Sequence, residues 1–275
     1  MKQLQMFIAL SLLFIAFNSC QKDETAATFD EISLSQQETL TEETLYEIDI
    51  LVDEALDLNL GFLKSANMAN MLFLGDCPLV TFDRKATPQV MTIDFGTGCS
   101  GKDGKTRSGK IIVTSTAFNV FPSVRSKSFE NFMVEGKKIS GSVTKSISKD
   151  QENNIRTAVV QENITITFPN AEGTATRVAN MTRQYMRSAL ANPADNQVVS
   201  WGTVEFTRIS GVKVTKTIAA EKPLVYKAAC RHIVSGVVSF KNSENKSWKI
   251  DYGTGVCDNI ATLTIGDKTK EIKIR

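Results

Sequence analysis

Two similar segments hold the acidic residues of this chain whose setting could support chemistry. Residues 93–99 read IDFGTGC, and residues 250–257 read IDYGTGVC, so Asp94 and Asp251 occupy equivalent places. A glycine-rich turn can hold phosphate, an aspartate can bind calcium, and two carboxylates can hydrolyse a glycoside. Each copy has one aspartate, and no Lys-Ser or Lys-Thr follows at P-loop spacing. We therefore favour structural turns capped by the aspartates, and keep Asp94 and Asp251 as ligand candidates.

The only histidine, His232, offers little basis for catalysis. A serine hydrolase of the common α/β type would carry a Gly-x-Ser-x-Gly motif, and none occurs here. Catalytic zinc usually needs several His, Cys or carboxylate ligands, and one histidine with cysteines that we expect to be oxidised supplies too few. We interpret His232 as structural and predict no catalytic set, no metal and no cofactor.

The two tryptophans are candidates for a glycan site, because sugars stack on exposed aromatic rings. Trp201 stands beside Gly202 near a predicted loop and is the better ligand candidate. Trp248 alternates with Ile250 and Tyr252, which predicts packing in the core or in a cross-strand ladder. Packing is the interpretation we favour for both rings.

The start of the chain predicts export and a lipid anchor. Residues 6–17 are apolar except Ser11. This run is shorter than the roughly 20 residues that span a bilayer, and it suits the centre of a signal peptide followed by a cleavage site. Cys20 stands at that junction. We predict that residues 1–19 are removed and that acyl chains on Cys20 hold the protein on a membrane.

The segment around Cys20 resembles the lipobox of bacterial lipoproteins, in a relaxed form with Phe17 and Asn18 upstream. The following residues 21–24, QKDE, look like the export signal of Bacteroidetes-type lipoproteins. The β-rich body with its IDFGTGC-like motifs is similar to an uncharacterised family of such lipoproteins. The resemblance implies a lipid-anchored protein of the outer membrane that faces the cell exterior. It implies no specific activity.

The remaining cysteines predict disulfides. Without Cys20 the chain has an even number of cysteines, namely Cys77, Cys99, Cys230 and Cys257. An even number in an exported protein favours disulfides, which these four residues could form in more than one combination. Each repeated segment ends in a cysteine and has another cysteine upstream. We predict the pairs Cys77–Cys99 and Cys230–Cys257.

Charge is distributed unevenly along the chain. Residues 21–63 hold twelve acids and one base, whereas residues 64–275 hold thirty bases and eighteen acids. The two parts could attract one another, or the basic part could face an anionic surface such as lipopolysaccharide. We favour a third interpretation, in which these are solvated faces with Lys and Arg side chains at exposed strand positions.

The N-terminal part of the mature chain is predicted to be a tether followed by a helix. Residues 20–38 are polar and begin with the lipidated Cys20. In the helical segment 39–75, Thr39 starts a capping box, and a helix is expected from about residue 40 to 60. Its apolar stripe would be buried against the sheet. The stripe consists of Leu45, Ile48, Val52 and Ala55.

Residues 76–275 are predicted to form an antiparallel β domain. From Leu79 onward apolar and polar residues alternate, and short turns such as Glu135-Gly136 and Ser210-Gly211 separate the alternating runs. The fold class is therefore mainly β: an antiparallel meander of about ten to twelve strands with one N-terminal amphipathic helix. The meander forms an open barrel or a sandwich.

Three functions are compatible with these predictions. The first is a non-enzymatic binding or structural module on the cell surface, held to the membrane through Cys20, with a glycan, lipid or protein as ligand. The second is a surface hydrolase such as a glycosidase, for which Asp94 and Asp251 are the first carboxylates to test. The third is a lipid-carrier-like open barrel that faces the periplasm. Mild basicity without a recognition motif predicts no nucleic-acid partner.

Overall fold

The computed structural model describes residues 24–59, 73–74, 78–153, 155–169, 173–186 and 193–274 of the chain. In this part of the protein, one long helix accompanies a single antiparallel sheet of fifteen strands. The predicted fold class, mainly β with one N-terminal helix, is confirmed. The signal peptide, Cys20 and Cys77 lie outside the described residues, so the statements about them stay predictions.

The bounds of the elements follow the chain. The helix is α1 (Glu24–Asn59), and a short 3-10 helix is η3 (Pro193–Asp195). The strands are β1 (Leu79–Asp83), β2 (Gln89–Asp94), β3 (Cys99–Ser100), β4 (Thr106–Ser115), β5 (Ser123–Val134), β6 (Lys137–Asp150), β7 (Ile155–Phe168), β8 (Gly173–Met186), β9 (Gln197–Thr207), β10 (Lys213–Ile218), β11 (Leu224–Lys227), β12 (His232–Asn242), β13 (Ser247–Thr254), β14 (Ile260–Ile265) and β15 (Lys268–Lys273).

Neighbouring strands in the sheet are almost always neighbours in the chain, as expected for a meander. Two departures add one strand each, and the continuous path of thirteen strands is itself longer than the ten to twelve expected. β3 adds a two-residue pairing to one end of β4, and β10 and β11 share one position between β9 and β12. Segments as short as β3 and β11 carry no detectable alternation. The strands form one continuous sheet, which matches the open-barrel alternative better than a sandwich of two sheets.

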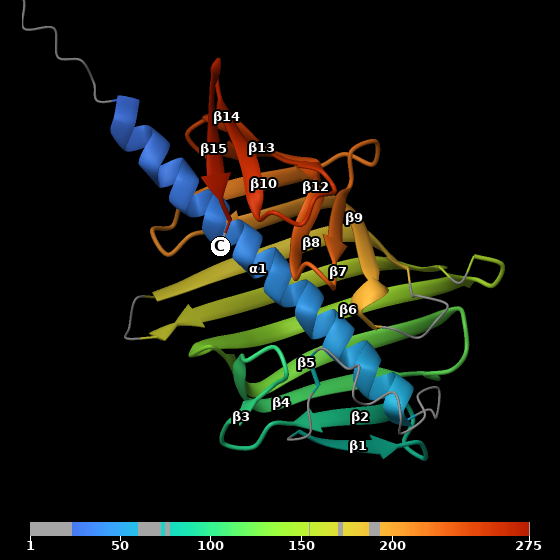
Figure 1. The fold of residues 1–275 in the computed structure, drawn as a ribbon. Coiled ribbons are helices and arrows are strands. Elements are labelled where there is room, and N and C mark those ends of the chain that lie inside the picture. Colours follow the sequence, from blue (N-terminus) through green and yellow to red (C-terminus); the bar gives the residue numbers. More distant parts are fainter. Residues whose placement is uncertain are drawn as a thin grey trace, which may run out of the picture.

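Helix α1 crosses the concave face of the curved sheet diagonally, from the edge at β14 and β15 to the edge at β1 and β2 (Figure 1). Near the first edge, the Gln36 side chain donates a hydrogen bond of 2.6 Å to the Lys273 carbonyl. The helix starts well before the predicted Thr39, so the expected tether is helical from Glu24 onward. Helix propagation from a fixed segment is far easier than initiation, which lets the buried part extend toward the N-terminus.

The core lies between α1 and the concave face. Every residue from Leu45 to Val52 is buried, and this stretch exceeds two turns, so the helix is buried on all sides there. The predicted apolar stripe is buried as expected, and on strands such as β8 buried and exposed residues alternate. All-round burial leaves no solvated side for the acids of this stretch, Glu47 and Asp49. Their charges must therefore be balanced inside the protein.

Candidate functional site

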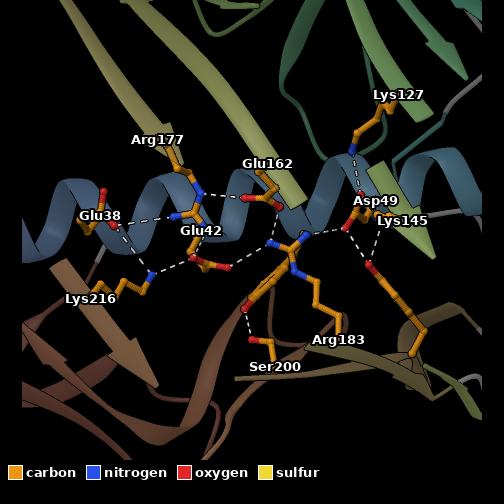
Figure 2. A network of polar contacts seen from close by, with 12 residues as sticks. Glu38, Glu42, Asp49, Lys127, Lys145, Glu162, Arg177, Arg183, Ser200 and Lys216 are labelled. Atoms are coloured by element: carbon orange, nitrogen blue, oxygen red, sulfur yellow. Dashed lines mark hydrogen bonds and ion pairs between the residues drawn. The ribbon is translucent and has the colours of Figure 1, made fainter. Parts of the chain in front are cut away.

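Charged side chains from α1 and the middle strands of the sheet meet in the core (Figure 2). Glu42 and Asp49 stand at its centre, seven residues apart and therefore on the same side of the helix. We call this set the buried charge network. Its members are Glu38, Glu42, Tyr46 and Asp49 of α1, Lys127 of β5, Lys145 of β6, Glu162 of β7, Arg177, Arg183 and Tyr185 of β8, Ser200 of β9 and Lys216 of β10.

Glu42 holds together one end of the network. Its Oε2 atom accepts hydrogen bonds from Arg177 Nη2 and Lys216 Nζ, both at 2.7 Å, and its Oε1 atom lies 3.4 Å from Arg183 Nη2. Glu162 bridges the same two arginines, at 2.9 Å from Arg177 Nε and 2.7 Å from Arg183 Nη2. Burial alone would raise the pKa of Glu42, but the three surrounding cations lower it well below its ordinary value. The cations act in the same direction on the pKa of Glu162.

Glu38, one turn before Glu42, is in a different situation. Its nearest cations in the described part of the chain, Arg177 Nη1 and Lys216 Nζ, are both 3.8 Å away, and neither of its oxygens accepts a hydrogen bond there. Burial raises the pKa of Glu38 above its ordinary value, and the cations offset this only in part. Glu38 therefore keeps a proton more readily than Glu42.

Asp49 organises the other end of the network. Its Oδ1 atom lies 2.6 Å from Lys145 Nζ and 2.7 Å from Lys127 Nζ. Its Oδ2 atom lies 3.1 Å from Arg183 Nη1 and accepts a hydrogen bond of 2.9 Å from Tyr185. Burial would raise the pKa of Asp49, but the three cations lower it far below the ordinary range. Burial also lowers the pKa of Lys145 to about 8, with Asp49 opposing and the neighbouring cations reinforcing the shift.

A cavity of about 30 Å³ opens beside Asp49. Asp53, one turn further along α1, borders it and accepts two hydrogen bonds from Arg156 of β7, at 2.6 and 3.2 Å. Arg125 of β5 lies 3.9 Å from Asp53 and donates to the Phe118 carbonyl at 2.8 Å. This end of the network thus combines a small cavity with a concentration of basic groups.

A larger crevice of about 190 Å³ lies along another side of α1. Leu40, which is 37% exposed, stands at its edge on the helix, and Lys105 and Lys137 are among its polar lining groups. Most of the lining is apolar and comes from the sheet. The apolar residues are Leu40, Leu45, Val134, Ile139, Ile166, Phe168 and Phe206. Such a lining suits an apolar group of a ligand.

Asp94 and Asp251, the acidic ligand candidates, act inside their own turns. Asp94 Oδ1 accepts a hydrogen bond from the Gly96 amide at 2.8 Å, and Asp251 Oδ1 accepts one from the Gly253 amide at 2.9 Å. Both glycines have positive φ, +59° and +79°, a backbone conformation that residues with a side chain rarely adopt. The turn interpretation is confirmed. The two aspartates belong to β2 and β13, and within the described residues no hydrogen bond or ion pair joins them.

The other predicted residues have structural settings. Trp201 lies within β9, half-buried and packed against the core. Trp248 is buried and stacks on Phe240 across β12 and β13, with ring centres 5.2 Å apart, which confirms its predicted packing. His232 is buried, and its Nε2 atom accepts a hydrogen bond of 3.1 Å from the Asn259 amide.

The cysteine prediction is tested for one pair. Cys230 and Cys257 form the predicted disulfide, with Cα atoms 5.4 Å apart. Cys99 is buried and disulfide-bonded, but Cys77 lies outside the described residues. The pairing of Cys77 with Cys99 therefore stays a prediction.

The favoured interpretation of the charges, solvated faces with exposed Lys and Arg, is wrong for the buried charge network. Attraction between the acidic and basic parts, the first alternative, describes these contacts. A sequence signal for it exists in the alternation of the strands, because several network residues stand at inward positions between two apolar residues. Examples are Lys145 between Val143 and Ile147, Glu162 between Val160 and Ile164, and Lys216 between Val214 and Ile218.

Within the described residues, no helix has the length and apolar character needed to cross a membrane. No group of three or more His, Cys, Asp or Glu residues among them is arranged to hold a metal ion. Comparison of the chain with protein-family models, with curated proteins and with solved structures found no match.

Proposed function

We propose that this chain is a lipid-anchored outer-membrane protein, facing the cell exterior, whose body acts as a binding module. The apolar run before Cys20 and the QKDE segment after it support the anchor and the address. The position of α1 also suggests how the anchor would be connected to the body of the protein. Because the helix begins at Glu24 and continues into the core, it would connect the acylated cysteine directly to the body.

The apolar crevice beside α1 carries the binding part of the proposal. Its volume of about 190 Å³ and its apolar lining suit an acyl or aromatic group. Helix α1 lies across the concave face of the sheet, where an open-barrel carrier would enclose its cargo (Figure 1), and its side chains from Leu45 to Val52 are buried there. Binding beside the helix is therefore better supported than transport inside a barrel. A hydrolase receives less support, because Asp94 and Asp251 are each engaged in a separate turn.

The anchor is tested with Cys20→Ser. This variant should lose acylation and move from the membrane fraction to the soluble fraction, while Ser19→Ala, which keeps a small residue before the cysteine, should stay on the membrane. Protease added to intact cells should digest the unmodified protein. An unchanged membrane fraction for Cys20→Ser would contradict the anchor, and protection from protease would contradict the outward orientation.

The crevice is tested with Thr44→Phe, which introduces a ring at a residue of its lining. The probe is the neutral apolar dye N-phenyl-1-naphthylamine, whose fluorescence rises in apolar surroundings. Thr44→Phe should weaken dye binding because the ring occupies the space, whereas Thr215→Phe, at an exposed position of β10, should not. Equal dye binding by the two variants would show that the dye does not bind in the crevice.

A further inference from the structure

The small cavity at the Asp49 end of the buried charge network is lined by more cations than carboxylates. The two carboxylates are Asp49 and Asp53 of α1. Four cations face them from three strands: Arg125 and Lys127 of β5, Lys145 of β6 and Arg156 of β7. From β8, Tyr185 also lines the cavity, and Arg183 reaches Asp49 from the same strand. The lining thus carries an excess of two positive charges when all six groups are ionised.

The strand register places two of these cations against each other. Arg125 and Lys145 are direct partners across β5 and β6. Like charges directly opposite on one face of a sheet repel, and here both side chains turn toward the core rather than toward water. Lys127, two residues from Arg125 along β5, adds a third positive charge on the same face. The two aspartates compensate only part of this repulsion.

We propose that this cavity binds a small carboxylate such as acetate. Its volume of about 30 Å³ exceeds the roughly 10–15 Å³ that one water requires, so it admits a group of a few heavy atoms. The two oxygens of a carboxylate can each accept charge-assisted hydrogen bonds from Lys and Arg donors, which are stronger than neutral ones. A bound carboxylate would remove half of the excess positive charge and relieve the repulsion between Arg125 and Lys145.

Lys145 gives the proposal a pH dependence. Its pKa of about 8 means that the amine is cationic at pH 7 and largely neutral at pH 9.5. A cation attracts acetate and a neutral amine does not. Acetate affinity should therefore fall as the pH rises through about 8. Neither the membrane anchor nor the apolar crevice enters this inference, so its failure would leave the proposed function untouched.

Isothermal titration calorimetry of the full mature protein with sodium acetate at low ionic strength tests the site. At pH 7 we expect saturable binding of acetate and no binding of acetamide, its neutral analogue. Lys145→Met should weaken acetate binding by about tenfold through loss of one charge-assisted hydrogen bond. In this variant Asp49 still contacts Lys127 and Arg183. Lys213→Met, the same change at an exposed residue of β10, should leave the affinity unchanged.

Two further measurements separate a binding site from a structural charge cluster. Lys145→Arg keeps the positive charge and should retain acetate binding, and it replaces Lys145→Met as the informative variant if the latter does not fold. Affinity should be lower at pH 9.5 than at pH 7 in the unmodified protein. No saturable heat with acetate, equal affinities for Lys145→Met and Lys213→Met, or an affinity independent of pH would each overturn the proposal.

Discussion

Glu38 and Glu42 show how strongly the effect of one buried charge depends on its immediate partners. The two residues lie one turn apart on α1 and are both fully buried. Glu42 has cations within hydrogen-bonding distance on both oxygens, whereas the nearest cations to Glu38 are 3.8 Å away. The pKa of Glu42 is lowered and that of Glu38 is raised. Charge on Glu42 therefore favours the folded state, and charge on Glu38 opposes it.

Neutralising these two glutamates should have different consequences. Glu42→Gln should lower the free energy of unfolding at pH 7 by about 3 kcal/mol, because it leaves buried cations without their carboxylate. Glu38→Gln should change it by less than about 1 kcal/mol or raise it, because the charge that it removes is poorly compensated. Urea denaturation measures both.

A surface pair provides the control. Glu205 lies 3.3 Å from Lys213, and both side chains are more than half exposed. Glu205→Gln should therefore change stability by at most about 0.5 kcal/mol. Equal losses for Glu38→Gln and Glu42→Gln would mean that the hydrogen bonds of Glu42 have no special importance.

Helix α1 and the sheet depend on each other for their burial. The concave face carries the apolar core together with cations such as Arg177, Arg183 and Lys216, all buried. Without α1 these cations would lose Glu42 and Asp49, and the apolar residues around them would meet water. The helix alone would also be unstable, because the acidic residues between positions 38 and 54 repel one another along it. We infer that neither element is stable without the other.

Expression of residues 76–275 without α1 tests this interdependence. This fragment should lack a cooperative urea transition, and a synthetic peptide of residues 24–59 added in trans should restore one. A peptide with Glu42→Gln should restore it only at higher concentration, because the central ion pairs are lost. Near-ultraviolet circular dichroism and urea titration follow both effects. Cooperative unfolding of the fragment alone would contradict the inference.

At the scale of the whole molecule, folding brings the acidic residues of the helix into contact with the basic residues of the sheet. Twelve of the thirty acidic residues lie within residues 21–63, and members of this group contact bases from β5 to β10. The single sheet brings bases from distant parts of the chain to the same helix. The stability of the protein should therefore depend on pH through a small set of groups whose pKa shifts have a known direction.

Two pH ranges should show a rise in stability with increasing pH. The pKa values of Glu42, Asp49 and Glu162 are lowered in the folded state. Below about pH 4 the unfolded chain takes up protons first, so the free energy of unfolding falls as the pH decreases. The pKa of Lys145 is also lowered, to about 8. The charge on Lys145 therefore reduces the free energy of unfolding at pH 7, and this reduction disappears as the amine loses its proton above pH 8.

Urea denaturation at pH 3, 5, 7 and 9 checks both ranges. Glu42→Gln should reduce the change in stability between pH 5 and pH 3. Lys145→Met should remove the rise between pH 7 and pH 9, and Lys213→Met should leave both changes intact. A pH profile that Lys145→Met does not alter would show that this lysine titrates normally.

The sequence by itself determined the mainly β fold, the helix around Leu45 to Ala55, the hairpin turns and the Cys230–Cys257 pair. Each of these rests on local information: alternation of apolar residues, helical spacing, glycine at positive φ, or two similar strand-turn segments. The same local reasoning identified Asp94 and Asp251 as turn residues. It also supplied the proposals about Cys20 and the outer membrane, which depend on a short linear motif rather than on folding.

Only the tertiary structure decided which charges meet. Lys145, Glu162 and Lys216 are inward residues by alternation, but a strand pattern does not indicate what lies above the sheet. The contact of Glu42 with Lys216 joins residues 174 positions apart in the chain. Such contacts depend on the curvature of the sheet and on the path of α1 across it, and neither is a local property. Packing therefore turned the uneven charge of the chain into a buried network with a basic cavity at one end.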